Sequence, residues 1–245
     1  MREHKILFVT GASSEVGCRL ICDAADQYEV ILAHYCHCAD QLMEIKNEIG
    51  DKLILIRADF SDLEDVSQMI SKIEEMGYIP DHIVHLPAQK LNPQKFHKTD
   101  IEQYRTGFDL SVSSIIMILQ RFLPKMSRKK YGKILFMLTS VTLNTPPKYQ
   151  APYITTKYAL LGLMLDLARE YAEKGIMING ISPDMMETKF ISEMPELMIQ
   201  QNAANSPIGR NLTVEDVVPS FLYLLSDYAD AITGQNIGVT GGVVR

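Results

Sequence analysis

The 245-residue chain is predicted to form an α/β fold, a doubly wound parallel sheet of about seven strands with helices on both faces. Strand-like runs alternate strictly with helical patterns, which is typical of a parallel sheet covered by helices. Several of the strand-like runs, such as residues 134–138 (Ile-Leu-Phe-Met-Leu), are apolar at every position, as in strands buried on both faces. With 47% apolar and 22% charged residues, a chain of this length forms a core without disulfides or metal.

The elements follow one another without an internal repeat or a low-complexity linker, so one domain is expected over residues 1–245. Compact apolar runs predict strands at residues 5–10, 29–34, 52–58, 82–86, 133–139, 176–182 and 236–240. Apolar residues at three- and four-residue spacing predict helices at residues 16–26, 40–49, 63–76, 101–126, 153–174 and 214–226.

The chain is acidic, with 24 Lys and Arg against 30 Asp and Glu and a net charge of −6. Nucleic-acid binding depends on clustered cations that neutralise phosphates, so this composition argues against a nucleic-acid partner. The basic run Arg128-Lys129-Lys130 is interpreted as solvated charge at a helix C-terminus. No apolar segment is judged to reach the ~20 residues of a membrane span, so no membrane partner is expected.

All four cysteines lie within the first 38 residues. Cys36 and Cys38 flank His37, but Cys-x-Cys is not zinc-knuckle spacing and no second Cys-x-x-Cys pair exists. Reduced thiols without a metal are therefore expected. The apolar run at residues 6–10 ends at Gly11 and is too short for a signal peptide, so a cytoplasmic protein is predicted.

Two helical segments, at residues 115–119 and 157–169, are apolar on more than one face. A helix on the outside of a sheet needs only one apolar stripe. Either both helices are buried in the core on most sides, or they form a subunit interface. The second interpretation predicts a homodimer or homotetramer through residues 101–126 and 153–174.

A glycine-containing turn, residues 10–17 (Thr-Gly-Ala-Ser-Ser-Glu-Val-Gly), joins the first strand to the first helix. Its glycines permit a tight turn and close backbone approach, and free amides at the start of a helix attract a pyrophosphate. An ordinary strand–helix loop is the alternative, but the position after the first strand is the context that a dinucleotide site requires. The candidate phosphate-binding residues are Gly11, Ser13, Ser14, Val16 and Gly17.

The end of the second strand bears on the choice of cofactor. In NAD-binding folds an Asp or Glu about 20 residues past the glycines binds the adenosine ribose. Residues 33–37 (Ala-His-Tyr-Cys-His) contain no carboxylate, and Asp40 is expected on the next helix. This argues against NAD and for NADP, yet no Arg is present for the 2′-phosphate either, so the choice between NADP and NAD stays open.

Tyr153 and Lys157 have i, i+4 spacing on a predicted helix and share one face. A free tyrosine titrates near ~10, and a nearby ammonium lowers that pKa toward the range useful for proton transfer. Ser140 lies thirteen residues upstream at the carboxyl end of a strand, where ligands bind in parallel sheets. Taken alone, the Tyr/Lys pair is also compatible with an ordinary surface pair.

In this order, the motifs resemble those of the short-chain dehydrogenase/reductase family over essentially the whole chain, and most of all the 3-oxoacyl-carrier-protein reductase type. They are residues 10–17, Ala58-Asp59, Ser140, residues 153–157 (Tyr-Ile-Thr-Thr-Lys), residues 179–188 (Asn-Gly-Ile-Ser-Pro-Asp-Met-Met-Glu-Thr) and residues 232–242. The resemblance implies a Rossmann-like fold and hydride transfer between a nicotinamide cofactor and an alcohol or carbonyl, without a metal.

The resemblance also implies residue roles. Ser140 would polarise the substrate carbonyl, Tyr153 would be the general acid/base, and Lys157 would lower the tyrosine pKa and hold the nicotinamide ribose. The remaining expected contacts are Asp59 on adenine with Phe60 beside it, Pro183 and Thr188 along the nicotinamide, and Ser111 in a proton relay.

Four positions depart from the family pattern. Glu15 replaces a fingerprint glycine, and Pro87 removes an amide donor after the fourth strand. Ser111 stands where the relay asparagine is usual, and Asp184 stands where a glycine is usual. These changes leave open a catalytically weak or inactive member that acts as a nucleotide-binding or scaffold protein. A dehydratase or epimerase is less favoured, because such relatives usually carry a longer substrate domain.

Residues 184–212 resemble the mobile segment that closes over substrate in this family. The segment is rich in methionine, which adapts to varied apolar shapes: Met185, Met186, Met194 and Met198. An apolar or acyl-like ketone, of the 3-oxoacyl type, is therefore the expected substrate. Ordinary helix packing is the alternative explanation for these methionines.

Overall fold

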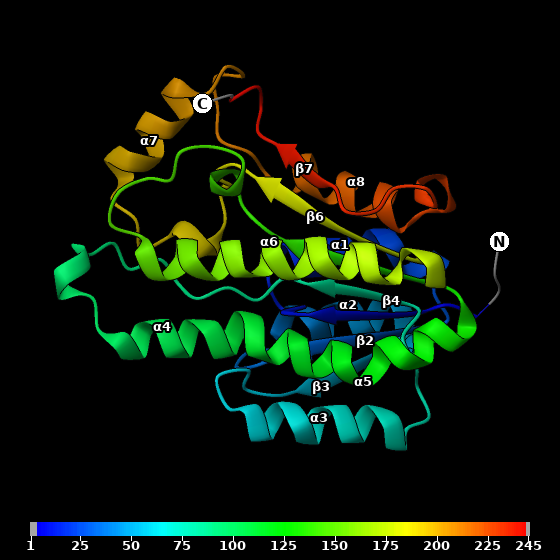
Figure 1. Cartoon of the computed structure of the whole chain (residues 1–245). Helices are drawn as coiled ribbons and strands as arrows, with labels where there is room; N and C mark the ends of the chain where they lie inside the picture. The colour runs from blue at the N-terminus through cyan, green and yellow to red at the C-terminus, as the bar shows by residue number, and fades with distance from the viewer. Residues whose placement is uncertain (1–3, 244–245) are drawn as a thin grey trace.

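The computed structural model describes residues 4–243 and shows one seven-stranded parallel sheet in the order β3-β2-β1-β4-β5-β6-β7 (Figure 1). The order reverses between β1 and β4, so the carboxyl ends of these strands open a crevice at that point. The predicted α/β fold is confirmed. The strands are β1 (Ile6–Thr10), β2 (Val30–Tyr35), β3 (Leu53–Arg57), β4 (His82–His85), β5 (Gly132–Met137), β6 (Ile176–Pro183) and β7 (Asn236–Val239).

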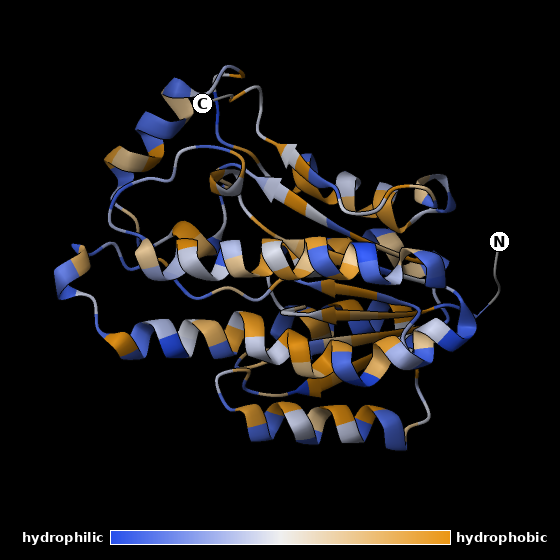
Figure 2. Ribbon diagram, viewed as in Figure 1, coloured by the Kyte–Doolittle hydropathy of each residue, from blue (hydrophilic) through white to orange (hydrophobic). Residues whose placement is uncertain are grey.

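Helices cover both faces of the sheet, and each face has its own apolar core. One core lies under α1 (Glu15–Ala24), α2 (Asp40–Ile49) and α8 (Val214–Leu225). The other lies under α3 (Leu63–Glu75), α5 (Ser114–Lys129) and α6 (Ala151–Tyr171), and α4 (Ile101–Phe108) packs against α6. In Figure 2 the strands are largely hydrophobic, as expected for strands buried on both faces. A short additional helix, α7 (Glu196–Asn205), lies beyond the carboxyl ends of the strands and was not predicted.

Local side chains fix where several helices begin. The Ser14 hydroxyl accepts a hydrogen bond from the Gly17 amide at the start of α1. Asp62 and Asp100 cap α3 and α4 in the same way, and each such cap stabilises a helix by about 1 kcal/mol. The Ser14 cap fixes the first turn of α1 just after β1, where the phosphate-binding site is predicted.

The helix predicted over residues 101–126 is interrupted. A π-helical turn, Asp109–Ser113, separates α4 from α5, and α5 continues to Lys129. π turns are rare and often occur at functional sites, because the extra residue turns a backbone carbonyl out of the regular helix. Here the carbonyl of Ser111 accepts a hydrogen bond from the His85 ring.

Over the described residues, one helical stretch, Ile101–Lys129, is long and apolar enough by length and composition to cross a membrane. This differs from the expectation that no segment reaches that length. Half of the apolar window is buried inside the protein, and side chains such as Ile115, Ile118 and Phe122 are fully buried. A helix packed into a protein core passes the same test, so the finding carries no membrane assignment.

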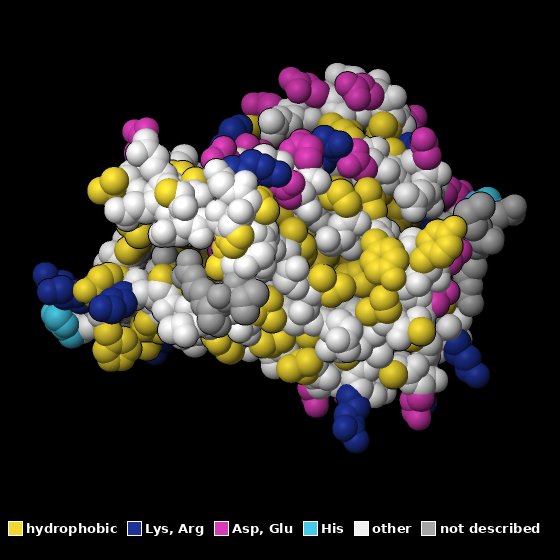
Figure 3. Space-filling view, turned by 90° about the horizontal axis from the view of Figure 1, so that it is seen from above, with side chains coloured by type: hydrophobic (Ala, Val, Ile, Leu, Met, Phe, Trp, Pro, Cys, Tyr) yellow, Lys and Arg dark blue, Asp and Glu magenta, His cyan; other side chains and the backbone are white. Residues whose placement is uncertain are grey.

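The described surface agrees with the mixed charge of the sequence. The turn η3 (Phe96–Lys98) bears exposed Phe, His and Lys side chains. On the face drawn in Figure 3, acidic and basic side chains lie among one another. The four cysteines are free thiols. Within residues 4–243, no group of three or more His, Cys, Asp or Glu side chains is placed to hold a metal ion.

Candidate active site

The turn between β1 and α1 forms a close-packed cradle. Gly11 has φ +68°, a left-handed conformation that favours glycine, and its amide donates to His34 Nδ1 at 3.0 Å. A Cβ on Gly17 would lie 2.5 Å from the carbonyl oxygen of Ala12, so only glycine fits there. The turn therefore brings the backbone tightly around the N-terminus of α1, as a pyrophosphate site requires.

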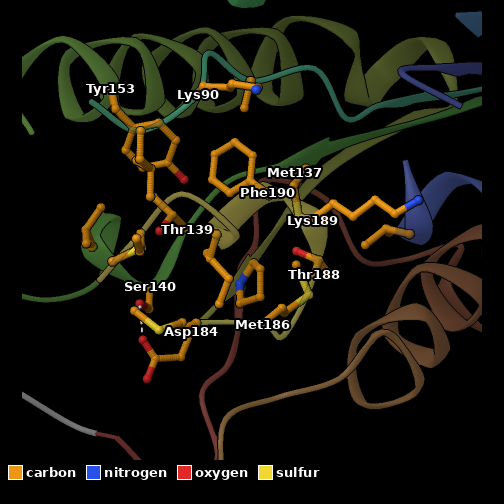
Figure 4. Close-up of a pocket in the computed structure, with 18 of the residues that line it drawn as sticks. Lys90, Met137, Thr139, Ser140, Tyr153, Asp184, Met186, Thr188, Lys189 and Phe190 are labelled. Atoms are coloured by element: carbon orange, nitrogen blue, oxygen red, sulfur yellow. Dashed lines mark hydrogen bonds between the residues drawn. The ribbon is translucent and has the colours of Figure 1, made fainter. Parts of the chain in front are cut away.

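A cavity of about 570 Å³ runs from this turn to the Tyr153 side chain (Figure 4). This is within the usual size range of small-molecule sites. The predicted site residues that line it are Ser13, Ser14, Val16, Ser140, Tyr153, Lys157, Pro183 and Thr188. A dinucleotide fits the chemistry of this cavity, with helix N-terminal groups at one end and proton-transfer groups at the other.

Other predicted site residues do not line the cavity. Gly11 and Gly17 shape the turn from behind. Phe60 is buried and stacks on the His34 ring, with ring centres 3.8 Å apart. Asp59 accepts hydrogen bonds from the amide and hydroxyl of Ser61, which lowers the pKa of its carboxyl. Ser111 lies beneath the site.

His34 occupies the end of β2, where a ribose-binding carboxylate would stand in an NAD-specific protein. Its Nδ1 accepts from Gly11 and its Nε2 donates to the carbonyl oxygen of Ala58 at 3.0 Å. Burial lowers the pKa of His34 to about 4, so the ring is neutral at physiological pH. The neutral imidazole thus accepts a hydrogen bond from the glycine turn and adds no charge at the end of β2, where an adenosine ribose would bind.

The carboxylate of Glu15, at the departure from the family pattern, reaches across the cavity. Its Oε2 accepts a hydrogen bond from the Lys189 amide at 2.8 Å. Lys189 belongs to a short 3₁₀ turn, Lys189–Ile191, in the methionine-rich segment. This contact links the phosphate-binding turn to the segment expected to cover the substrate.

Lys157 lies one helical turn beyond Tyr153 on α6, and both side chains line the cavity. Lys157 Nζ donates to the carbonyl oxygen of Met137 at 2.7 Å and lies 5.7 Å from the centre of the Tyr153 ring. Burial lowers the pKa of Lys157 to about 7. The hydrogen bond to Met137 keeps Lys157 Nζ beside the phenol ring of Tyr153.

The pKa of Tyr153 shifts in the direction opposite to the prediction. Burial raises it to about 12, and a side-chain hydrogen bond with Thr139 offsets part of the increase. Burial is the larger of these two causes. A positive charge close to the phenol would act in the opposite direction and lower this pKa.

The predicted hydroxyl, Ser140, faces a different partner. Ser140 Oγ donates to Asp184 Oδ1 at 2.9 Å, the contact drawn as a dashed line in Figure 4. The neighbouring Thr139, which the sequence reasoning did not single out, also lines the cavity. Two adjacent hydroxyl residues at the end of β5 thus belong to the cavity wall.

Beneath the site, His85 connects β4 to the π turn. Its Nε2 donates to the Ser111 carbonyl oxygen at 2.9 Å, so Nδ1 accepts from the Thr10 hydroxyl at 2.8 Å. Burial lowers the pKa of His85 to about 3 and keeps the ring neutral. Ser111 Oγ is buried and has no hydrogen-bond partner in the structure. This buried hydroxyl therefore keeps its capacity for a further hydrogen bond.

The methionine-rich segment forms the outer wall of the cavity. Met185, Met186, Met194 and Met198 all line it. Phe190 lies near Tyr153, with ring centres 6.1 Å apart, and Lys90 forms an ion pair with Glu193 at 2.7 Å across the mouth. The wall is mostly apolar around the reacting end.

Comparisons with known proteins agree with this geometry. A family model described as Enoyl-(Acyl carrier protein) reductase matches residues 23–244. The chain therefore belongs to the short-chain dehydrogenase/reductase family, the class of enzyme that the parallel sheet, glycine turn and Tyr153/Lys157 pair define. It is an NAD(P)-dependent oxidoreductase of that family.

Individual relatives cover nearly the whole chain. A 3-oxoacyl-[acyl-carrier-protein] reductase of Staphylococcus aureus is 26% identical over 246 residues, 99% of each chain. An NADPH-dependent aldehyde reductase-like chloroplastic protein of Arabidopsis thaliana is 26% identical over 256 residues, covering 98% of this chain and 94% of the relative. Among solved structures, a 4-hydroxyisoleucine dehydrogenase complexed with NADH superposes with a TM-score of 0.88 at 21% identity over 98% of each chain.

Proposed function

We propose that the protein reduces a ketone, or oxidises the corresponding alcohol, on an apolar acyl-like substrate with NADP(H) as the preferred cofactor. The observation that carries this proposal is one continuous cavity with the glycine turn at one end and Tyr153, Lys157 and the β5 hydroxyls at the other. The reacting side chains are assembled, which favours an active enzyme over an inactive scaffold.

The proposed roles of the chain's groups follow from their positions. When bound, the nicotinamide supplies the hydride in reduction and accepts it in oxidation. Tyr153 donates its phenol proton to the substrate carbonyl oxygen, and a hydroxyl from Thr139 or Ser140 holds that oxygen. Lys157, when charged, stabilises the tyrosinate that remains. The hydrogen bond from His85 to the Ser111 carbonyl oxygen ties β4 to the π turn, and the Ser111 hydroxyl would take part in a proton relay.

The predicted cofactor contacts are kept as part of this proposal. Ser13, Ser14 and Val16 would meet the pyrophosphate at the first turn of α1, with Gly11 and Gly17 shaping the turn. Pro183 and Thr188 would lie along the nicotinamide, and Asp59 with Phe60 would border the adenine.

NADP(H) is preferred in this proposal because of the end of β2. The residues that line the cavity there include no carboxylate that could bind a ribose 2′-hydroxyl. The Arabidopsis relative is named as NADPH-dependent. An acyl-like substrate is supported by the methionine wall and by the names of the reductases that this chain resembles.

The experiment is a steady-state screen of the purified protein with NADPH or NADH on 3-oxoacyl thioesters, simple aliphatic ketones and sugar ketones. The proposal predicts turnover of the acyl-like ketones, with a higher kcat/KM for NADPH. Activity confined to sugars, or a clear preference for NADH, would refute the substrate or the cofactor assignment respectively.

The proposed assembly is a homodimer or homotetramer through α4/α5 and α6. The outer face of α6 leaves Leu165 48% and Tyr158 44% exposed, and Phe108 on α4 is 39% exposed. Apolar side chains on facing helices are suited to self-association.

The four free thiols are consistent with a reducing, cytoplasmic compartment, and we place the protein there. Residues 1–245 are taken as one catalytic unit in which residues 184–212 close over the substrate.

A further inference from the structure

Two charged side chains of opposite sign, Glu15 and Lys189, line the cavity beside the glycine turn. Glu15 is the first residue of α1, and Lys189 comes from the methionine-rich segment on the other side of the cavity. A carboxylate at the start of α1 opposes phosphate binding, because it repels the phosphate and offsets the positive potential of the helix start. A phosphate bound at this turn therefore needs a compensating cation from elsewhere in the chain.

The backbone of Lys189 is anchored on both sides of its side chain. Its amide donates to Glu15 Oε2 at 2.8 Å, which holds the residue against the first turn of α1. Its carbonyl oxygen accepts from the amide of Ser192 at 3.2 Å and from the hydroxyl of Ser192 at 2.8 Å. The Lys189 side chain thus extends into the cavity from a fixed point.

The Lys189 side chain is directed toward the glycine turn. In Figure 4 it is extended, with its nitrogen beside the ribbon of α1. Burial and the neighbouring Cys22 raise the pKa of the Cys18 thiol, and the Lys189 ammonium acts against this rise. Cys18 Sγ lies 3.5 Å from the carbonyl oxygen of Ala12, which belongs to the turn. The ammonium is therefore close to the turn that is proposed to hold the pyrophosphate.

Lys189 differs from the other two lysines that line the cavity. Lys90 forms an ion pair with Glu193, and Lys157 donates to a backbone carbonyl oxygen. In the described part of the chain, the Lys189 ammonium forms neither an ion pair nor a hydrogen bond. A compact ammonium of this kind is well suited to a phosphate oxygen.

The position of Lys189 favours the pyrophosphate over a ribose 2′-phosphate. Lys189 directly follows Thr188, which is proposed to lie along the nicotinamide, and its amide is bound at the start of α1. The pyrophosphate joins the two halves of the cofactor and lies between these two places. A 2′-phosphate belongs farther along, at the end of β2.

Resting on the oxidoreductase function proposed above, we propose that Lys189 binds the pyrophosphate of the cofactor from the side opposite the glycine turn and offsets the charge of Glu15. Glu15 is a positioning residue, because it holds the Lys189 amide. Lys189 belongs to residues 184–212, so its contact with the pyrophosphate also holds this segment over the cavity. NADPH and NADH share the pyrophosphate, so Lys189 contributes equally to the binding of both.

The test is a fluorescence titration of wild type, Lys189→Gln and Lys189→Arg with NADPH and with NADH. Lys189→Gln should raise the Kd of both cofactors by a similar factor of about 10–30, the usual weight of a charge-assisted hydrogen bond. Lys189→Arg keeps the positive charge, and its Kd should stay within about threefold of wild type. An unchanged Kd in Lys189→Gln would overturn the proposal. A rise for NADPH alone would also overturn it, because the ammonium would then bind the 2′-phosphate.

A control variant and the salt dependence show whether the charge of Lys189 acts directly. Lys72→Gln removes the same charge from an exposed position on α3, outside the cavity, and should match wild type. Raising NaCl from about 0.05 M to about 0.5 M should weaken cofactor binding more in wild type than in Lys189→Gln, because the variant lacks one screened attraction. Equal salt dependence in the two proteins would contradict a direct contact with the pyrophosphate.

The titration also separates this inference from the proposed function. If wild type binds NADPH or NADH but reduces no ketone, the proposed function fails, and the Kd values still decide the role of Lys189. If wild type binds neither cofactor, both proposals are refuted.

Discussion

The buried ring of His34 makes a quantitative prediction about stability and pH. His34 is 3% exposed, and burial lowers its pKa from 6.5 to about 4 in the folded protein. Below pH 6.5 the unfolded chain binds a proton at this residue that the folded protein excludes. Stability is therefore complete above pH 6.5 and falls as the pH drops toward 4.

The size of the effect follows from the two pKa values. At pH 5 the imidazole of the unfolded chain is almost fully protonated, whereas the folded one is about a tenth protonated. At 1.36 kcal/mol for each unit of pKa difference, His34 alone lowers the free energy of unfolding by about 2 kcal/mol between pH 8 and pH 5.

The assay is urea unfolding at a series of pH values for wild type and His34→Asn. Asparagine keeps an acceptor for the Gly11 amide but cannot titrate in this range. The variant should be less stable at pH 8, yet its loss between pH 8 and pH 5 should be smaller than that of wild type by about 2 kcal/mol. The difference between the two curves removes the contributions of the other buried histidines, His82 and His85. Parallel curves for the two proteins would refute the reasoning.

Three further predictions concern the glycine turn and the outer face of α6. Glu15→Gln keeps an acceptor for the Lys189 amide but removes a negative charge next to the phosphate-binding turn. The Kd for NADPH in a fluorescence titration should therefore fall by about 3–10-fold, which corresponds to about 1 kcal/mol. A higher Kd would contradict this prediction. Gly17→Ala places a Cβ 2.5 Å from the Ala12 carbonyl oxygen. It should lower the free energy of unfolding by about 1–3 kcal/mol and weaken NADPH binding. Wild-type stability and wild-type NADPH affinity would show that the turn tolerates a side chain there. Leu165→Glu introduces a charge on the exposed face of α6 and should reduce the molar mass measured by light scattering to that of a smaller assembly, whereas an unchanged mass would remove α6 from the proposed interface.

Most of the fold was predictable because its signals are local. Runs such as residues 134–138 are apolar at every position, and this pattern occurs in strands covered on both faces. Ser14 and Asp62 mark helix starts by side-chain chemistry that is visible in the sequence. The π turn at Asp109–Ser113 was not predictable, because one extra residue in a helical turn barely disturbs the apolar spacing.

The site was predictable in part, for a similar reason. The i, i+4 spacing of Tyr153 and Lys157 places both on one helix face in any context. Spacing along the chain could not show that Ser140 donates a hydrogen bond to Asp184, because these residues lie 44 positions apart and meet only in the folded protein. The Glu15 contact with Lys189 joins residues 174 positions apart and depends on the tertiary fold.

The most direct test of the whole account is single-turnover reduction by Tyr153→Phe with NADPH and the ketone that wild type reduces fastest. The phenylalanine keeps the ring beside Lys157 but has no proton to give to the carbonyl oxygen. The account predicts an NADPH Kd within about threefold of wild type and a reduction rate at least about 10³-fold lower. Reduction at the wild-type rate, or failure of the wild-type protein to bind either NADPH or NADH, would contradict it.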